Sequence, residues 1–225
     1  MVMLSPPTQK AITFDPVYLR TKQVLDTFFT LLILLPLCIV LVVFAVLIRL
    51  DSKGPIFFRQ KRVGQNGAEF EMLKFRSMYV HSDDSTHRDA VKLYMNEGAL
   101  NGKADAKNPY KLVDDSRVTR VGCFIRKTSI DELPQFINVL RGEMTLVGPR
   151  PPLPYEVEAY RTRDRLRLSG KPGLTGTWQV YGRSRVTFNE MVEMDIAYFQ
   201  QPSMWQDLKL IALTLPVMLL GRGGV

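Results

Sequence analysis

The chain has 225 residues, enough to bury one compact core, which argues for one globular domain with an attached segment rather than two independent domains. Its formal net charge of +8 indicates an anionic partner, which could be nucleic acid, phospholipid headgroups or a phosphate-bearing substrate. The two cysteines, Cys38 and Cys123, form neither a disulfide framework nor a zinc-ligand spacing. They exclude a secreted disulfide-rich domain and favour a reducing compartment.

A membrane segment is expected at 20–50, after an N-terminal tail at 1–19. Residues 28–48 carry no charge and would form a helix about 30 Å long, enough to cross a bilayer. Pro36 lies near the middle, and basic residues flank both ends, including Arg20 and Lys22 on the N-terminal side. These two features favour a re-entrant helix-break-helix with both ends in the cytoplasm. A kinked single span remains the alternative.

Residues 51–225 are expected to form a cytoplasmic, interfacial catalytic domain. Short strands at 56–58 and 69–73 around a loop at 64–67 predict a β-hairpin. A polar excursion at 81–115 holds His81 and His87, which are expected on the surface. The predicted fold class is therefore mostly α with a small β-hairpin (α+β).

The second half of the chain is expected to be mainly helical. Apolar residues at helical spacing predict a helix at 131–141, which begins with two acids and a proline. A basic helix is predicted between the loop at 148–152 and the turn at 171–176. The stretch 205–220 is apolar but too short to span a membrane, so we expect an interfacial helix there.

Asp131 and Glu132 are the main candidates for chemistry. The start of a helix favours negative charge, so both carboxylates should be ionised, and an ionised carboxylate can act as a nucleophile. The alternative is purely structural, because Ser129 followed three residues later by Glu132 fits a capping box. Without further context the capping role is the better interpretation.

Basic residues surround this pair and suit the binding of phosphate oxygens. The run from Arg161 to Lys171 could instead bind nucleic acid or anionic lipid headgroups. That second possibility would make the chain a membrane-anchored basic binding module. The sequence contains no P-loop, no G-x-G-x-x-G fingerprint, no Gly-x-Ser-x-Gly elbow and no metal-binding histidine pattern.

Four segments resemble one known family, the bacterial sugar transferases, which are monotopic polyprenyl-phosphate phosphoglycosyl transferases. The resemblance runs from about Arg20 to the C-terminus, apart from the polar excursion. The matching segments are KFRSM at 74–78, TRVGCFIRKTSIDELPQFINVLRGEMTLVGPRP at 119–151, KPGLTGTWQVYGRS at 171–184 and MDIAYF at 194–199. Four motifs in the same order make the resemblance specific.

The resemblance implies transfer of a sugar 1-phosphate from a UDP-sugar to undecaprenyl phosphate, with release of UMP. Asp131 would attack the β-phosphorus to give an aspartyl phosphosugar, and Glu132 would hold a Mg²⁺ cofactor. Arg150 matches a phosphate-contacting arginine. Lys74 and Asp195 match two further polar positions of the family, and Arg183 matches one directed towards the nucleotide.

The resemblance also bears on partners and location. It implies the bacterial inner (cytoplasmic) membrane, a catalytic domain on its cytoplasmic face, a role in exopolysaccharide or other glycan assembly, and no nucleic acid. It favours the re-entrant bend at Pro36, although Leu35 stands where the family usually has serine. The chain looks like the minimal form of the family, and glucose or galactose phosphates are the favoured sugars. A homo-oligomer and a single-span scaffold remain open.

Overall fold

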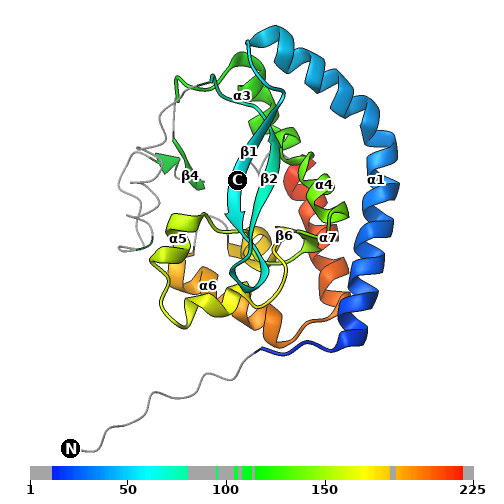
Figure 1. Ribbon diagram of the computed structural model, residues 1–225, viewed down its shortest axis with the longest axis vertical. Coiled ribbons are helices and arrows are strands. Elements are labelled where there is room, and N and C mark those ends of the chain that lie inside the picture. Colours follow the sequence, from blue (N-terminus) through cyan, green and yellow to red (C-terminus); the bar gives the residue numbers. More distant parts are fainter. Residues whose placement is uncertain are drawn as a thin grey trace, which may run out of the picture.

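The computed structural model describes residues 12–80, 95, 104–105, 108–112, 115–182 and 186–219. These residues form one long N-terminal helix and a mostly helical globular unit with three two-stranded sheets (Figure 1). This arrangement agrees with the expected α+β class. The predictions for His81, His87 and Arg183 lie outside the described residues.

Helix α1 (Pro16–Asp51) is 36 residues long and begins four residues before the predicted start of the membrane segment. Asp15 fixes its start, because its side chain accepts a hydrogen bond from the Val17 N–H at 2.8 Å. The predicted break at Pro36 is absent, and the helix runs through it without interruption. A single proline removes one backbone hydrogen bond while its neighbours remain. Figure 1 shows α1 rising along one side of the molecule and curving across its top.

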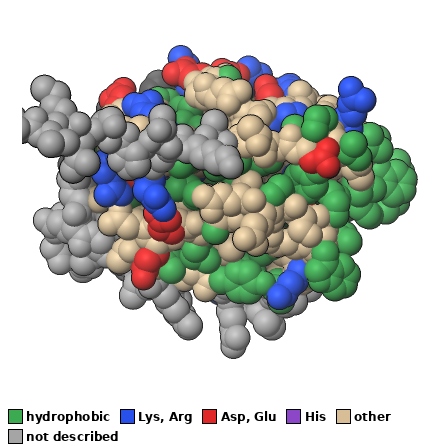
Figure 2. Space-filling model, turned by 90° about the horizontal axis from the view of Figure 1, so that it is seen from below, with side chains coloured by type: hydrophobic (Ala, Val, Ile, Leu, Met, Phe, Trp, Pro, Cys, Tyr) green, Lys and Arg blue, Asp and Glu red, His purple; other side chains and the backbone are tan. Residues whose placement is uncertain are grey.

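The middle of α1 exposes a continuous apolar surface. Leu35 and Ile39 are 78% and 74% exposed. In Figure 2 hydrophobic side chains gather at the right edge, the side on which α1 runs in Figure 1. Within the described residues α1 is the one helix long and apolar enough to cross a membrane. Such a surface favours association with a bilayer.

The N-terminal end of α1 is anchored to the globular unit by a buried polar network. The Lys22 ammonium lies 2.6 Å from the carboxylate of Asp207 in α7 (Met204–Leu219). Tyr198 in α6 (Phe188–Gln200) donates to the same carboxylate at 2.6 Å, and Thr145 donates to Asp26. Lys22, predicted as a charge flanking the membrane segment, is therefore buried, because a carboxylate inside the fold compensates its charge.

The C-terminal end of α1 packs on the same globular unit. Ile48 is buried against Phe75 and Ile125. The Asp51 carboxylate accepts a hydrogen bond from the Val121 N–H at 3.1 Å, and the buried Arg76 donates to Ser52 O at 2.6 Å. Both ends of α1 thus pack on the same globular unit, and the exposed middle of the helix arches between these two contacts (Figure 1).

The predicted hairpin is confirmed. Strands β1 (Phe57–Val63) and β2 (Glu69–Phe75) pair antiparallel, with Phe57 opposite Phe75 and Val63 opposite Glu69. The loop between them forms the short 3₁₀ helix η1 (Gln65–Gly67), in which Asn66 and Gly67 adopt positive φ. Both strands are longer than expected, because the ladder extends through the charged positions of β1.

A second sheet pairs β5 (Thr145–Val147) in parallel with β6 (Gly173–Thr175). Their connection contains α5 (Pro154–Glu158) and the 3₁₀ helix η3 (Asp164–Leu168), so the single basic helix predicted here is wrong. The third pair, β3 (Ala104–Asp105) and β4 (Asn108–Leu112), lies in the polar excursion. A Cβ on Gly173 would lie 2.1 Å from the Gly148 nitrogen, so β6 approaches the loop after β5 as only glycine allows.

The remaining helices surround these sheets. They are α3 (Arg120–Lys127), the 3₁₀ helix η2 (Ile130–Glu132), α4 (Gln135–Leu140) and the π-helical turn η4 (Trp178–Gly182). The helix predicted at 131–141 is therefore two pieces, a 3₁₀ turn and a short α-helix, with Pro134 at the junction. The helix predicted at 205–220 is confirmed as α7. The main hydrophobic core joins β2, α4, β5, α6 and α7 through Met72, Val139, Leu146, Phe199 and Leu210.

Candidate active site

Asp131 and Glu132 lie in the short turn that connects α3 to α4. Ser129 adopts the left-handed conformation (φ 58°, ψ 17°), and its carbonyl accepts the Glu132 N–H at 3.2 Å. The Ser129 side chain makes no capping hydrogen bond, so the capping-box interpretation is wrong. Both acids are partly exposed. The turn presents two adjacent carboxylates that solvent can reach.

Lys74 is brought to this turn by β2. Its ammonium lies 3.0 Å from the Glu132 carboxylate, and the two side chains are 15% and 22% exposed. The structure thus joins two of the motifs found in the sequence. A cation beside adjacent carboxylates offsets their mutual repulsion and suits a site for a phosphate-bearing substrate.

Asn138 holds α4, and therefore the acidic turn, against β2. Its side-chain oxygen accepts the Leu73 N–H at 3.0 Å, and its side-chain nitrogen donates to Glu71 O at 2.8 Å. These bonds satisfy the edge of β2 that faces away from β1. Asn138 is fully buried. Sequence reasoning missed this residue, and the signal that could have found it was a lone asparagine among the apolar positions of the helix.

Arg150 lies in a loop whose backbone is fixed on both sides. The Gly148 N–H donates to Thr175 O at 2.8 Å, and the Val63 N–H donates to Pro152 O at 2.9 Å. Arg62, which is buried, donates to Pro151 O at 2.8 Å. Arg150 itself is partly exposed on this rigid loop. Its contact with phosphate stays a prediction.

Asp195 lies inside the globular unit. It pairs with Arg167 at 2.7 Å, both side chains are almost fully buried, and Arg167 also donates to the Tyr160 hydroxyl at 2.7 Å. Burial raises the pKa of Asp195 to about 6, although the guanidinium of Arg167 lowers it in part. The structure therefore gives Asp195 an internal ion pair, and its role as one of the family's polar site positions, in phosphate or nucleotide binding, stays a prediction.

The basic run from Arg161 to Lys171 is largely matched by acids. Arg161 pairs with Asp164 at 3.0 Å, and Arg163 pairs with Glu193 at 2.5 Å. Arg167 is the buried partner of Asp195. These pairs remove most of the positive surface that a nucleic-acid binding module would need.

In the described part of the chain, the predicted magnesium ion would have only the carboxylates of Asp131 and Glu132 as protein ligands. Among the described residues no group of three or more His, Cys, Asp or Glu side chains could hold a metal ion. Magnesium commonly takes one or two carboxylates and completes its shell with water and substrate phosphates. The adjacent carboxylates of Asp131 and Glu132 fit that requirement. The cofactor stays a prediction.

The chain is similar to proteins of one family. The family model described as bacterial sugar transferase matches residues 17–221. The galactosyl transferase CpsE of Streptococcus agalactiae is 45% identical over 207 residues, which are 92% of this chain and 44% of CpsE. The exopolysaccharide production protein ExoY of Sinorhizobium fredii is 37% identical over 203 residues, which are 90% of this chain and 87% of ExoY.

A third relative is the UDP-glucose:undecaprenyl-phosphate glucose-1-phosphate transferase of Escherichia coli. It is 38% identical over 202 residues, which are 86% of this chain and 39% of that protein. The chain thus spans less than half of CpsE and of the Escherichia coli transferase, and most of ExoY.

Proposed function

Because this chain belongs to the bacterial sugar transferase family, we propose that it transfers a sugar 1-phosphate from a UDP-sugar to undecaprenyl phosphate, giving undecaprenyl-diphospho-sugar and UMP. The observation that carries the proposal is the contact between Lys74 and Glu132 beside Asp131. The names of two relatives support the substrates: the glucose-1-phosphate transferase described above and an undecaprenyl-phosphate galactose phosphotransferase of Salmonella typhimurium. Exopolysaccharide or other glycan assembly is the process they indicate.

In the first step a carboxylate oxygen of Asp131 attacks the β-phosphorus of the UDP-sugar. A phosphorus–oxygen bond forms to Asp131, and the bond between that phosphorus and the bridging oxygen breaks. UMP leaves with the bridging oxygen as a phosphate oxyanion, so this step needs no general acid. In the second step an oxygen of undecaprenyl phosphate attacks the same phosphorus and releases the Asp131 carboxylate.

The neighbouring groups stabilise charge during both steps. The Lys74 ammonium lies near enough to Glu132 to act on the same phosphate group. Arg150, on its rigid loop, and Arg183 are proposed to bind the phosphates and the nucleotide. Magnesium held by Glu132 would supply further positive charge at the phosphates when bound.

We also propose a re-entrant topology with the globular unit on the cytoplasmic face of the bacterial inner membrane. Its support is that Lys22 and Ile48, near opposite ends of α1, both pack on one globular unit. A helix that crossed the bilayer would place its ends on opposite faces. The arch with the exposed residues Leu35 and Ile39 at its middle is the part that enters the lipid.

The test is UMP release by the detergent-solubilised full chain with UDP-glucose or UDP-galactose, polyprenyl phosphate and magnesium. Asp131→Asn should lower turnover by more than about 10³-fold, because an amide is a poor nucleophile. Glu158→Gln is the matched control, since Glu158 is exposed on α5 and lies outside the proposed chemistry. Wild-type turnover in Asp131→Asn would contradict the proposed nucleophile. With UDP-sugar alone, stoichiometric UMP release should accompany a covalent adduct that mass spectrometry detects.

A further inference from the structure

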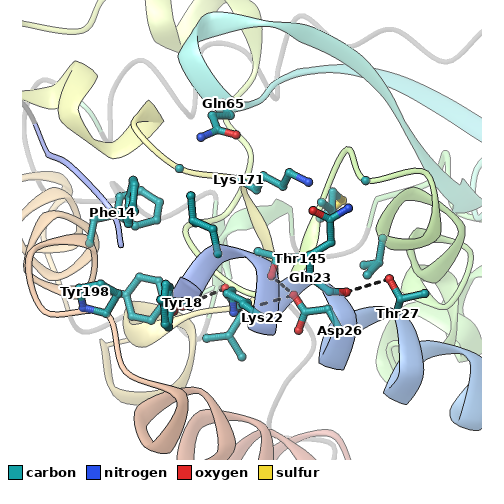
Figure 3. A pocket seen from close by; sticks show the side chains of 18 residues that line it. Phe14, Tyr18, Lys22, Gln23, Asp26, Thr27, Gln65, Thr145, Lys171 and Tyr198 are labelled. Carbon is teal, nitrogen blue, oxygen red and sulfur yellow. Dashed lines mark hydrogen bonds and ion pairs between the residues drawn. The ribbon is translucent and has the colours of Figure 1, made fainter. Parts of the chain in front are cut away.

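A cavity of about 140 Å³ lies beside the first turns of α1 (Figure 3). Lys22 and Asp26 of α1 line one side, and Lys171 and Gln65 lie across from them (Figure 3). Val139 and Gly142 place the C-terminal end of α4 in the wall. Asp131 and Glu132 precede the other end of α4, so the cavity is separate from the candidate active site.

The size of the cavity restricts its ligand. One water needs about 10–15 Å³ of cavity volume, so the cavity has room for several waters. Sites for whole small molecules usually enclose about 300–1,000 Å³. A phosphate group with a few attached carbons fits a cavity of this size.

Most polar groups in the wall are satisfied within the protein. Lys22 lies 2.6 Å from Asp207 and 3.9 Å from Asp26, and Tyr198 donates to Asp207 at 2.6 Å. Burial raises the pKa of Asp26, with the Lys22 charge opposing the shift.

Lys171 is different, because its ammonium has no carboxylate partner among the described residues. The side chain is partly buried, and a Cβ built on Gly142 would lie 3.6 Å from its nitrogen. Gln23, which also lines the cavity, likewise makes no side-chain hydrogen bond within the described part of the chain. The cavity therefore offers one uncompensated positive charge and a free amide, which suit a ligand with a single negative charge.

The helix that forms the wall leads from the cavity to the apolar arch. Leu19, Gln23 and Thr27 line the cavity and belong to one ridge of side chains four residues apart. The same ridge continues to Leu31 and Leu35, which are 52% and 78% exposed. A hydrocarbon chain attached to a headgroup in the cavity can follow this ridge to the proposed lipid-embedded stretch.

We propose that the cavity binds the phosphodiester headgroup of an anionic membrane phospholipid, with Lys171 at the phosphate and an acyl chain along the ridge to Leu35. A phosphodiester carries one negative charge, which matches the one uncompensated lysine. The proposal rests on the membrane placement of α1 and is independent of the chemistry at Asp131.

The test is the affinity of the detergent-solubilised full chain for dioctanoyl-phosphatidylglycerol, measured by titration calorimetry without UDP-sugar. Lys171→Gln should raise the dissociation constant about tenfold, because it removes a charged hydrogen bond, and Lys171→Arg should restore most of the affinity. Gln23→Trp should weaken binding by filling the mouth of the cavity. Lys209→Gln makes the same charge change at an exposed position of α7 and should alter the constant less than twofold.

Three comparison ligands complete the test. Dioctanoyl-phosphatidylcholine has the same chains without net charge and should bind at least about fivefold more weakly. Inorganic phosphate should not displace the lipid at equal concentration, and polyprenyl phosphate should bind no tighter than phosphatidylglycerol. Equal affinity of wild type and Lys171→Gln overturns the proposal, as does displacement by free phosphate or preference for polyprenyl phosphate. Because no turnover is measured, this outcome is independent of the proposed transferase activity.

Discussion

Lys74 and Glu132 are separated by 58 positions in the chain and by 3.0 Å in space. Their motifs could be found in the sequence, because both lie in distinctive local patterns. Asp207 has no such local pattern, and Asn138 shows only as a lone asparagine among apolar helix positions, which does not reveal its partners. Each is a buried polar residue whose partners lie far along the chain, at Leu73 and at Lys22. Residue types and spacing predict local chemistry, whereas buried polar networks depend on the tertiary fold.

Lys74→Met should lower the rate of UMP release by about 10²-fold, because it removes a preorganised positive charge at the proposed phosphate site. Stability should fall by no more than about 1 kcal/mol, since the ion pair is partly exposed to solvent. Initial rates and thermal melting in the same detergent measure both effects. Lys74→Arg is the control and should keep most of the rate. A Lys74→Met protein with wild-type turnover would remove Lys74 from the site.

Asp195 predicts a specific pH dependence of stability. Burial disfavours the charged form and raises the pKa of its carboxyl from an ordinary value of 3.8 to about 6 in the folded protein. The stabilising contribution of the protonated form is complete below the unfolded pKa and is lost as pH rises through 6. Between pH 4 and pH 7 the wild type should lose about 2 kcal/mol more than Asp195→Asn.

Unfolding of both proteins in detergent at the two pH values measures this difference. The comparison with Asp195→Asn cancels the titration of all other groups to first order. A difference of the opposite sign would show that the Arg167 charge outweighs burial at this position.

At the scale of elements, the hairpin was predictable because two short stretches containing apolar residues surround a loop with two glycines. The pair of β5 and β6 was not predictable, since each strand has three residues, too few to show a periodic pattern. The helix predicted at 131–141 was only partly correct. The left-handed Ser129 and the position of Pro134 divide it into η2 and α4, and spacing alone does not reveal such a division.

Asn138→Leu should destabilise the protein by about 2–4 kcal/mol, because the Leu73 N–H and the Glu71 carbonyl lose their partner in a buried place. Turnover should also fall, since α4 positions the acidic turn beside Lys74. Thermal melting and UMP release measure the two effects. Asn189→Leu is the control at an exposed position of α6 and should change stability by less than about 1 kcal/mol.

At the scale of the whole molecule, the long apolar helix was predicted from composition, but its anchoring was not. Its polar residues Lys22, Asp26 and Thr30 are buried at four-residue spacing. Of these three, only Lys22 was singled out in the sequence, as a basic residue flanking the membrane segment. In the structure all three face the globular unit, where β5 and α7 present polar partners to Asp26 and Lys22.

The proposed topology predicts where the two ends of α1 can be labelled. Single cysteines at Val17 and Lys53, both exposed, should react with an impermeant maleimide from the cytoplasmic side only. The background replaces the exposed Cys38 and Cys123 by alanine. Inside-out and right-side-out vesicles provide the two sides. A cysteine at Leu35 is the control and should be protected in both. Labelling of Val17 and Lys53 from opposite sides would establish a spanning helix.

The contact between Lys22 and Asp207 can form only late in synthesis, long after α1 has been made. The two residues are 185 positions apart, so the ribosome must make most of the chain before this anchor can form. At about 5–20 residues per second, the apolar helix waits roughly 10–40 s without its partner. During that time the bilayer is the surface that can bury it. The proposed membrane placement therefore predicts that the helix inserts first and that the globular unit folds onto it afterwards.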